Sequence, residues 1–385
     1  MSYWDWDKVY ELWRAGESAF VQGQHSAAAE LYRQATEKAD ASGDVPTWLR
    51  GVMRRSFADE LTTLERLREA LAVLSEMPKT TEGGFRACCV YGSMTDQVEI
   101  AVKLPVNLAA IERACEQADA YFRAAGERDW QSRLLYYRAE LLYQRGLYRE
   151  ALAVAQEGAV HAANGCPKLF PSTHMWGLFR ISLALGDLAE AKRYLDKWVR
   201  KYDTEDKHGP ARYAYYYVMA SRLARAEGKA DGAVECSRAG AETLAGADWG
   251  DARFQLGCEQ VRAYLFAGHH ALAGTHLARL ARARRSESGH RRYAFALLLG
   301  DYHLARARAA AGLPAFDDEF GRTGEPPREP VRSNGSEAAR ARRAYGEALK
   351  VGAWIDEKLV CSVRTEEVSG RLARVSQVKR AAAAA

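Results

Sequence analysis

The chain has 385 residues, of which 48% are hydrophobic and 27% are charged, and its formal net charge is +5. These values indicate a folded, water-soluble chain and argue against attraction of the whole molecule to nucleic acid or anionic lipid. The acidic, aromatic N-terminus and the lack of an apolar run of about 18 residues predict a cytoplasmic protein with neither a secretory signal nor a membrane span.

An alanine recurs along the chain at steps of 40 to 42 residues. Such a period is typical of repeat proteins, in which a small residue marks the closest approach of two helices. Ala, Leu, Glu and Arg dominate the periodic segments, which favours helix over strand. The sequence therefore predicts an all-α fold built on the alanines Ala28, Ala70, Ala110, Ala151, Ala191, Ala233 and Ala273.

The first unit shows the pattern most clearly. A helix is predicted over 5–22, then a turn at Gly23, then a second helix that carries Ala28 and Tyr32. The glycine ends the first helix without a steric penalty, and the alanine lets the second helix pack closely. Together with Gly16 and Ala35, this spacing closely resembles the tetratricopeptide repeat. The same turn is expected at Gly146, Gly186, Gly228 and Gly268.

Other units follow the pattern less closely. The units at about 44–78 and 82–126 keep the alanine but have Glu65 and Pro105 in place of the turn glycine. An eighth unit is expected from about Arg291, with its turn at Gly312. Its second helix contains Ala341, Tyr345 and Ala348, and a capping helix is expected over 357–378.

The chain thus divides into three parts. Residues 1–312 form repeats one to seven and the first helix of repeat eight. Residues 313–336 are rich in Pro, Gly and charge and are expected to form a flexible loop. Residues 337–385 supply the second helix of repeat eight, the capping helix and a basic, alanine-rich tail. The resemblance to long-repeat tetratricopeptide arrays of bacterial regulators and peptide receptors implies a right-handed α-solenoid superhelix of about eight hairpins.

The resemblance also points to a binding face. In this family the residue six positions before the turn glycine faces the concave groove, and here four acids are followed by four arginines: Glu17, Asp59, Glu99, Glu140, Arg180, Arg222, Arg262 and Arg306. Arginines bind carboxylates by paired hydrogen bonds, so the C-terminal half is predicted to bind an acidic segment of a protein or peptide, or a bipolar one together with the acidic half. A solvated charged face is the alternative.

Aromatic residues lie four positions before some of these charges and would anchor a partner or pack between helices: Trp13, Tyr136, Trp176 and Tyr302. The 313–336 loop contains Asp317, Asp318 and Glu319 between Phe316 and Phe320. This acidic cluster either folds back as an internal plug for the arginine half or belongs to a linker without a role in binding.

No enzyme motif, phosphate-binding loop or metal-ligand spacing is present, so we predict no enzyme activity, no cofactor and no metal. His269, His270 and His276 lack a nearby ligand partner. The seven cysteines are scattered and predict free thiols, and the basic run 279–292 is too isolated to favour nucleic acid. The sequence predicts a peptide- or protein-binding scaffold or adaptor. The alternatives are a bacterial signal-peptide receptor that changes superhelical pitch on binding and an enzyme of unrecognised type.

Overall fold

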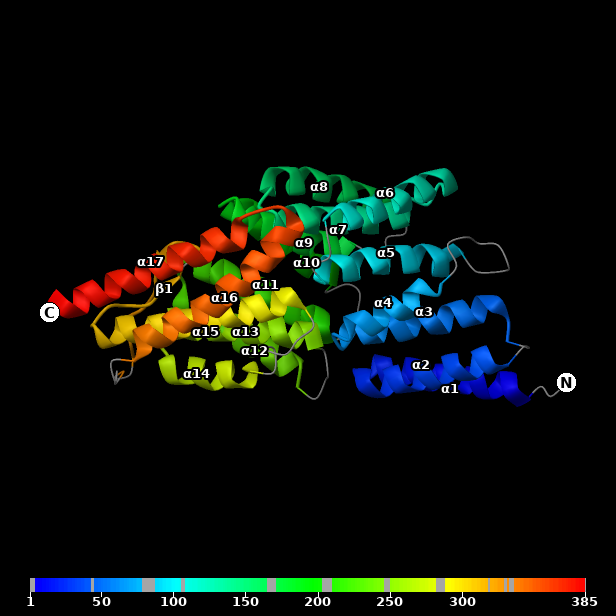
Figure 1. Cartoon of the computed structure of the whole chain (residues 1–385), viewed down its shortest axis with the longest axis horizontal. Coiled ribbons are helices and arrows are strands. Elements are labelled where there is room, and N and C mark those ends of the chain that lie inside the picture. Colours follow the sequence, from blue (N-terminus) through cyan, green and yellow to red (C-terminus); the bar gives the residue numbers. More distant parts are fainter. Residues whose placement is uncertain are drawn as a thin grey trace. The chain divides into compact units, whose positions relative to one another are not determined.

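Helices make up most of the described part of the chain, as expected for an all-α protein (Figure 1). The computed structural model describes residues 4–42, 45–77, 87–104, 108–164, 171–202, 210–245, 250–281, 288–317, 319–328, 331 and 336–384. Its helices are α1 (Trp4–Val21), α2 (His25–Ala41), α3 (Thr47–Thr63), α4 (Leu67–Ser75), α5 (Ala87–Lys103), α6 (Leu108–Ala125), α7 (Arg128–Gln144), α8 (Tyr148–Asn164), α9 (Pro171–Ala184), α10 (Leu188–Tyr202), α11 (Pro210–Glu227), α12 (Ala230–Thr243), α13 (Gly250–Phe266), α14 (His270–Arg279), α15 (Gly289–Ala310), α16 (Glu337–Leu359) and α17 (Val363–Ala384).

The chain forms two compact units. Unit 1 consists of residues 1–141, 153–174 and 246–251, and unit 2 consists of residues 142–152, 175–245 and 252–385. In the described part of the chain, no helix is both long enough and apolar enough to cross a lipid bilayer.

The turns between paired helices form at the expected positions. Gly23, between α1 and α2, has φ +71°, and the amide of Gln24 donates to the carbonyl of Ala19 at 2.9 Å, which closes the end of the helix. Glu65 adopts φ +63° at the corresponding place between α3 and α4. A residue with a Cβ is strained there by about 1 kcal/mol, yet it makes the same turn. Pro105 lies outside the described residues.

Six of the seven periodic alanines are fully buried, and one is not. Ala28, Ala70, Ala151, Ala191, Ala233 and Ala273 have no exposed surface. Ala110 is exposed, and its neighbour Ile111 is fully buried instead. The predicted register was therefore wrong by one residue in this unit. No glycine fixed the turn there, so the alanine alone set the assignment.

The first and the eighth hairpin share a contact that links a glycine, a tyrosine and an acid. In unit 1, Tyr32 covers Gly16, and its hydroxyl donates to Glu17 at 2.5 Å. In unit 2, Tyr345 covers Gly300, and its hydroxyl donates to Asp301 at 2.8 Å. A Cβ on either glycine would meet the tyrosine ring, at 2.6 Å on Gly16 and 2.3 Å on Gly300. These two segments are thus equivalent hairpins.

The capping helix begins later than expected. Residues 357–359 belong to α16, which ends where Val360 turns to φ +53°. The Asp356 carboxylate then accepts hydrogen bonds from the amides of Arg364 and Thr365 at 3.0 and 2.8 Å. Because this side chain caps the free amides at the start of the next helix, α17 starts at Val363.

A two-stranded antiparallel hairpin interrupts the helices of unit 2. Strands β1 (Phe316–Asp317) and β2 (Arg322–Thr323) pair within the connection from α15 to α16. Ala315, just before β1, is 3% exposed and packs in a hydrophobic core with Phe254, Leu265 and Phe295. The base of the hairpin is therefore held by the helices of its own unit.

Candidate binding site

Three elements of unit 2 bring charged side chains together. Helix α11 presents Arg222 and Arg225 three residues apart, which places them on neighbouring positions of one helix face. Helix α13 presents Glu259 and Arg262 with the same spacing. The β1–β2 hairpin contributes a segment that we call the tip, defined as Asp317, Glu319 and Phe320.

Arg225 is the centre of this cluster. Its side chain is completely buried, and it forms a bidentate ion pair with Glu259, with Nε to Oε1 at 2.8 Å and Nη2 to Oε2 at 2.9 Å. Ser221 donates a further hydrogen bond to Glu259 at 3.0 Å. One edge of the guanidinium is therefore fixed from inside the unit, and the remaining donors point toward the hairpin.

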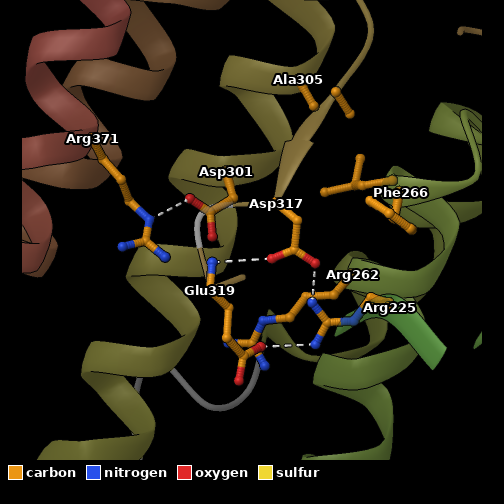
Figure 2. Close-up of a pocket in the computed structure, with 10 residues that line it drawn as sticks. Arg225, Arg262, Phe266, Asp301, Ala305, Asp317, Glu319 and Arg371 are labelled. Carbon is orange, nitrogen blue, oxygen red and sulfur yellow. Dashed lines mark hydrogen bonds and ion pairs between the residues drawn. The ribbon is translucent and has the colours of Figure 1, made fainter. Parts of the chain in front are cut away.

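The tip occupies those remaining donors (Figure 2). Arg225 Nη1 donates to the Asp317 carboxylate, and Nη2 donates to Glu319 at 2.8 Å. Glu319 also pairs with Arg222, so one carboxylate bridges two arginines of α11. The Phe320 ring centroid lies 5.0 Å from the Arg225 guanidinium carbon. The acidic residues thus fold back onto the arginines, while Asp318 and the Phe316 side chain lie outside the described residues.

The Glu319 carboxylate of the cluster is held in the ionised form. Burial raises the pKa of Glu319, but Arg222, Arg225 and Arg262 outweigh burial and hold that pKa below its ordinary range. Conversely, burial lowers the pKa of Arg225, while Asp317, Glu259 and Glu319 raise it well above the ordinary value. The site is electrostatically matched, with each charge stabilised by the opposite one.

A recess adjoins the tip (Figure 2). This recess, which we call the arginine recess, has a volume of about 40 Å³. It is lined by Arg225, Arg262, Leu265, Phe266, Asp301, Ala305, Ala315, Asp317, Glu319 and Arg371. On one wall Arg371 donates to Asp301 at 2.9 Å. Arg262 makes no ion pair or hydrogen bond with any residue that the structure describes. Burial lowers the pKa of its guanidinium, but nearby charges, Glu319 above all, raise that pKa above its ordinary value.

A second attachment holds the hairpin independently of the tip. We call residues 324–328 the strap. The amide of Glu325 donates to the carbonyl of Phe266 at 2.7 Å, and the amide of Arg328 donates to the carbonyl of Gly268 at 3.1 Å. A Cβ on Gly268 would lie 2.2 Å from the Pro326 carbonyl oxygen, so only glycine permits this approach.

In unit 1, two of the predicted groove acids lie in a charge-balanced cluster. Asp96, which sequence reasoning missed, pairs with Arg55 at 2.9 Å and with Arg133 at 2.5 Å. Glu99 pairs with Lys103 at 2.8 Å. Burial raises the pKa of Glu99, but the positive charges of Lys103 and Arg133 outweigh burial and lower that pKa to about 2. The expectation of a simple acidic surface was incomplete, because nearby cations neutralise these acids.

Asp59 belongs to the same cluster, but its pKa is raised, whereas the pKa of Glu99 is lowered. Its carboxylate lies 4.0 Å from Arg55. Its side chain is 48% exposed, so its loss of hydration is partial. Together with the negative charge of Asp96, this loss raises its pKa toward about 7, against the opposing effect of Arg55 and Arg133.

The other predicted site residues are half-buried and lie outside the Arg225 cluster. Among the charged ones, Glu17 accepts from Tyr32, Arg180 lies over the rings of Tyr143 and Trp176 at 4.4 and 5.6 Å, and Arg306 pairs with Glu337 at 3.2 Å. Glu140 is half-buried as well. The predicted aromatics Trp13, Tyr136, Trp176 and Tyr302 contact Tyr10, His174, Tyr215 and Arg306 respectively. Of the predicted arginines, Arg222 pairs with Glu319, whereas Arg262 lowers the pKa of that carboxyl without a hydrogen bond or ion pair to it.

Sequence reasoning missed Arg225, Glu259, Asp301 and Arg371. The spacing of Arg222 and Arg225 was a usable signal, because residues three apart share a helix face. Within the described residues, no three His, Cys, Asp or Glu side chains are arranged to hold a metal ion. Part of the basic run, 282–287, lies outside the described residues. No protein-family model matches this sequence, and no curated protein is significantly similar to it.

Proposed function

We propose that this chain is a binding protein that captures a protein or peptide partner through an acidic segment docked on Arg222, Arg225 and Arg262 of unit 2. The observation that carries the proposal is that two of these arginines already hold carboxylates from a segment more than 90 residues away in sequence. Planar guanidinium groups bind carboxylates in a defined geometry, which gives recognition as well as attraction.

Arg225 is fixed in place before a partner arrives. Glu259 holds Arg225 by two hydrogen bonds, and Ser221 in turn holds Glu259. A side chain that is already ordered loses less conformational entropy when it binds, so this support increases the affinity available to a ligand. The Phe320 contact further indicates that an aromatic residue beside the acids adds binding energy.

The electrostatics of the cluster favour binding over catalysis. A general acid or base works best when its pKa lies near the working pH. The pKa of Glu319 is instead held well below that range by three arginines. A carboxylate that stays charged at neutral pH is suited to an ion pair and unsuited to proton transfer.

We further propose that the helical hairpins stack as a tetratricopeptide-like solenoid and that the protein acts in the cytoplasm as a scaffold or adaptor. The equivalent contacts of Gly16 with Tyr32 and of Gly300 with Tyr345 support the repeat assignment. The balanced charges around Asp96 limit the proposed recognition of an acidic partner to the arginines of unit 2.

Quantitative affinity purification from the native host tests this function. Wild type is compared with Arg222→Glu and with a matched control, Arg238→Glu, which reverses an exposed arginine on α12. Circular dichroism and thermal unfolding establish that each variant is folded. A partner lost from Arg222→Glu but retained by Arg238→Glu supports the proposal. Identical partner sets for all three proteins would refute it.

A further inference from the structure

The tip has the chemistry of a ligand and lies where the proposed partner would bind. Resting on that proposed function, we propose that Asp317, Glu319 and Phe320 act as an intramolecular pseudo-ligand. The true partner then carries the same four-residue pattern. In chain order, this pattern is an acidic residue, any residue, a second acidic residue and an aromatic residue. It binds by displacing the tip.

The contacts of the tip define this pattern. The main-chain amide of Glu319 donates to Asp317 Oδ1 at 3.0 Å, which holds the Asp317 carboxylate against the main chain of the tip. The Asp317 carboxylate accepts a hydrogen bond from Arg225 Nη1, and the Glu319 carboxylate bridges Arg225 and Arg222. If the tip leaves, donors of the buried Arg225 lose their acceptors, which is unfavourable unless another acceptor replaces them. A competing ligand must therefore present two carboxylates with similar spacing.

The hairpin is built so that its tip can leave while its base stays. The strap is held by main-chain hydrogen bonds to Phe266 and Gly268, and none of these bonds involves the tip. Ala315 is buried at the other end of the hairpin. Between these anchors, each of the two strands has only two residues, and so short a pairing is weak alone. Opening of the tip does not require the anchors to break.

A partner also gains a contact that the tip does not make. Arg262 lines the arginine recess and forms no ion pair or hydrogen bond with a described residue. The side chains of Phe266 and Leu265 provide an apolar wall beside it. A peptide with a third acidic group can reach Arg262, which gives it an advantage over the tethered tip.

The tether sets how strongly the tip competes. A ligand on a short connection acts at an effective concentration of roughly millimolar, so a free peptide must overcome a competitor that is always present. The apparent affinity for a free peptide is proportional to the fraction of molecules in which the tip is open, so a mostly closed tip weakens binding. Neutralising the tip is therefore expected to tighten the binding of a free acidic peptide by about tenfold or more.

The test is a fluorescence anisotropy titration with a labelled synthetic peptide that copies residues 314–321 of this chain. A peptide with Asn and Gln in place of Asp and Glu is the ligand control. The proteins are wild type, Asp317→Asn with Glu319→Gln, the same double variant with Arg222→Glu added, and Glu325→Gln. The last removes one exposed negative charge from the strap and is the matched control.

Support for the pseudo-ligand requires four results together. The double variant binds the acidic peptide at least about tenfold more tightly than wild type. Glu325→Gln binds like wild type. Adding Arg222→Glu abolishes the gain, and the neutral peptide does not bind.

Two other outcomes overturn the inference and can be told apart. Equal binding by wild type and the double variant shows that the tip does not compete, while the proposed acidic-peptide site stands. Absence of binding by either protein refutes the proposed function and the pseudo-ligand together. Hydrogen exchange on wild type covers the case in which the double variant does not fold. Saturating peptide should accelerate exchange at 319–321 and leave the strap unchanged, and an unchanged tip contradicts the inference.

Discussion

Arg225 and Glu259 form an ion pair whose side chains are 0% and 1% exposed. The desolvation of two buried charges is costly, so such a pair contributes little net stability while it is intact. Removing Glu259 would take from the buried Arg225 the most deeply buried of the carboxylates that pair with it. The pair therefore couples the integrity of the unit 2 fold to the arrangement of the binding site.

Glu259→Gln is expected to lower the free energy of unfolding by about 3 kcal/mol, because Arg225 loses the most deeply buried of its carboxylate partners and a bidentate ion pair. Glu319→Gln is the comparison. Its carboxylate, with a side chain 24% exposed, is closer to water, and its loss should lower stability by about 1 kcal/mol or less. Urea unfolding followed by circular dichroism measures both values. Equal losses would show that the inner pair has no special role.

Gly186→Ala is expected to destabilise unit 2 by about 1 kcal/mol through backbone strain alone. Gly186 has φ +77°, and a Cβ there would meet no atom within 4 Å. Gly346→Ala is the control. A Cβ on Gly346 also meets no atom within 4 Å, but this glycine lies inside α16, where alanine fits the backbone without strain. That change should raise stability by about 0.5 to 1 kcal/mol. Thermal unfolding shows whether each variant is more or less stable than wild type. A Gly186→Ala variant more stable than wild type would contradict the turn geometry.

Gly300→Ala is expected to lower the free energy of unfolding by about 1 to 3 kcal/mol, because the added Cβ would lie 2.3 Å from the Tyr345 ring. If the first and eighth hairpins are equivalent, Gly16→Ala should cause a loss of similar size against Tyr32. Gly370→Ala in α17, where a Cβ meets nothing within 4 Å, should cause no loss. Denaturant titration of the three variants compares them, and an unaffected Gly300→Ala would refute the close contact.

Asp59 is expected to make stability fall as pH rises. Its pKa in the folded protein is about 7, above the value of about 4 in the unfolded chain. The native state therefore binds an extra proton between these values, so the contribution is complete below about pH 4 and lost as pH passes about 7. Asp59→Asn keeps the shape without the charge.

The variant should unfold at a higher urea concentration than wild type near pH 8, and the difference should shrink as pH falls toward about 5. Asp119→Asn is the control, because its carboxylate lies on α6 outside the Asp96 cluster and pairs with Arg123 one turn along the helix at 2.9 Å. A difference between Asp59→Asn and wild type that grows as pH falls would contradict the raised pKa.

The parts of the fold that depend on neighbouring residues could be predicted from the sequence. The helix ends at Gly23 and Gly312 need only a residue that tolerates positive φ, and both have it. The register at Ala110 failed because its unit lacks that glycine, so nothing local distinguished Ala110 from the buried Ile111. Local signals also placed the start of α17 too early. The amides at the start of this helix are capped by Asp356, which lies in the preceding helix, and the sequence pattern does not show that contact.

The binding site depends on residues that are distant in sequence, and it could be predicted only in part. Arg222 and Arg262 follow from the repeat, but the burial of Arg225 depends on Glu259 from another helix. The acidic composition of the tip suggested a plug, yet composition alone cannot distinguish docking from a free linker. The pairing of Glu319 with Arg222 required the three-dimensional path of the chain.

The hairpin enters the chain between two helices that hold each other without it. Helices α15 and α16 meet through Gly300, Asp301 and Tyr345, none of which belongs to the connection. The entropy cost of a longer connection grows only with the logarithm of its length, so replacing a short turn by residues 311–336 costs about 1.5 to 2 kcal/mol. This junction is therefore a natural place to graft foreign sequence. A reporter or a different recognition element inserted after Gly312 should leave the helical pair folded.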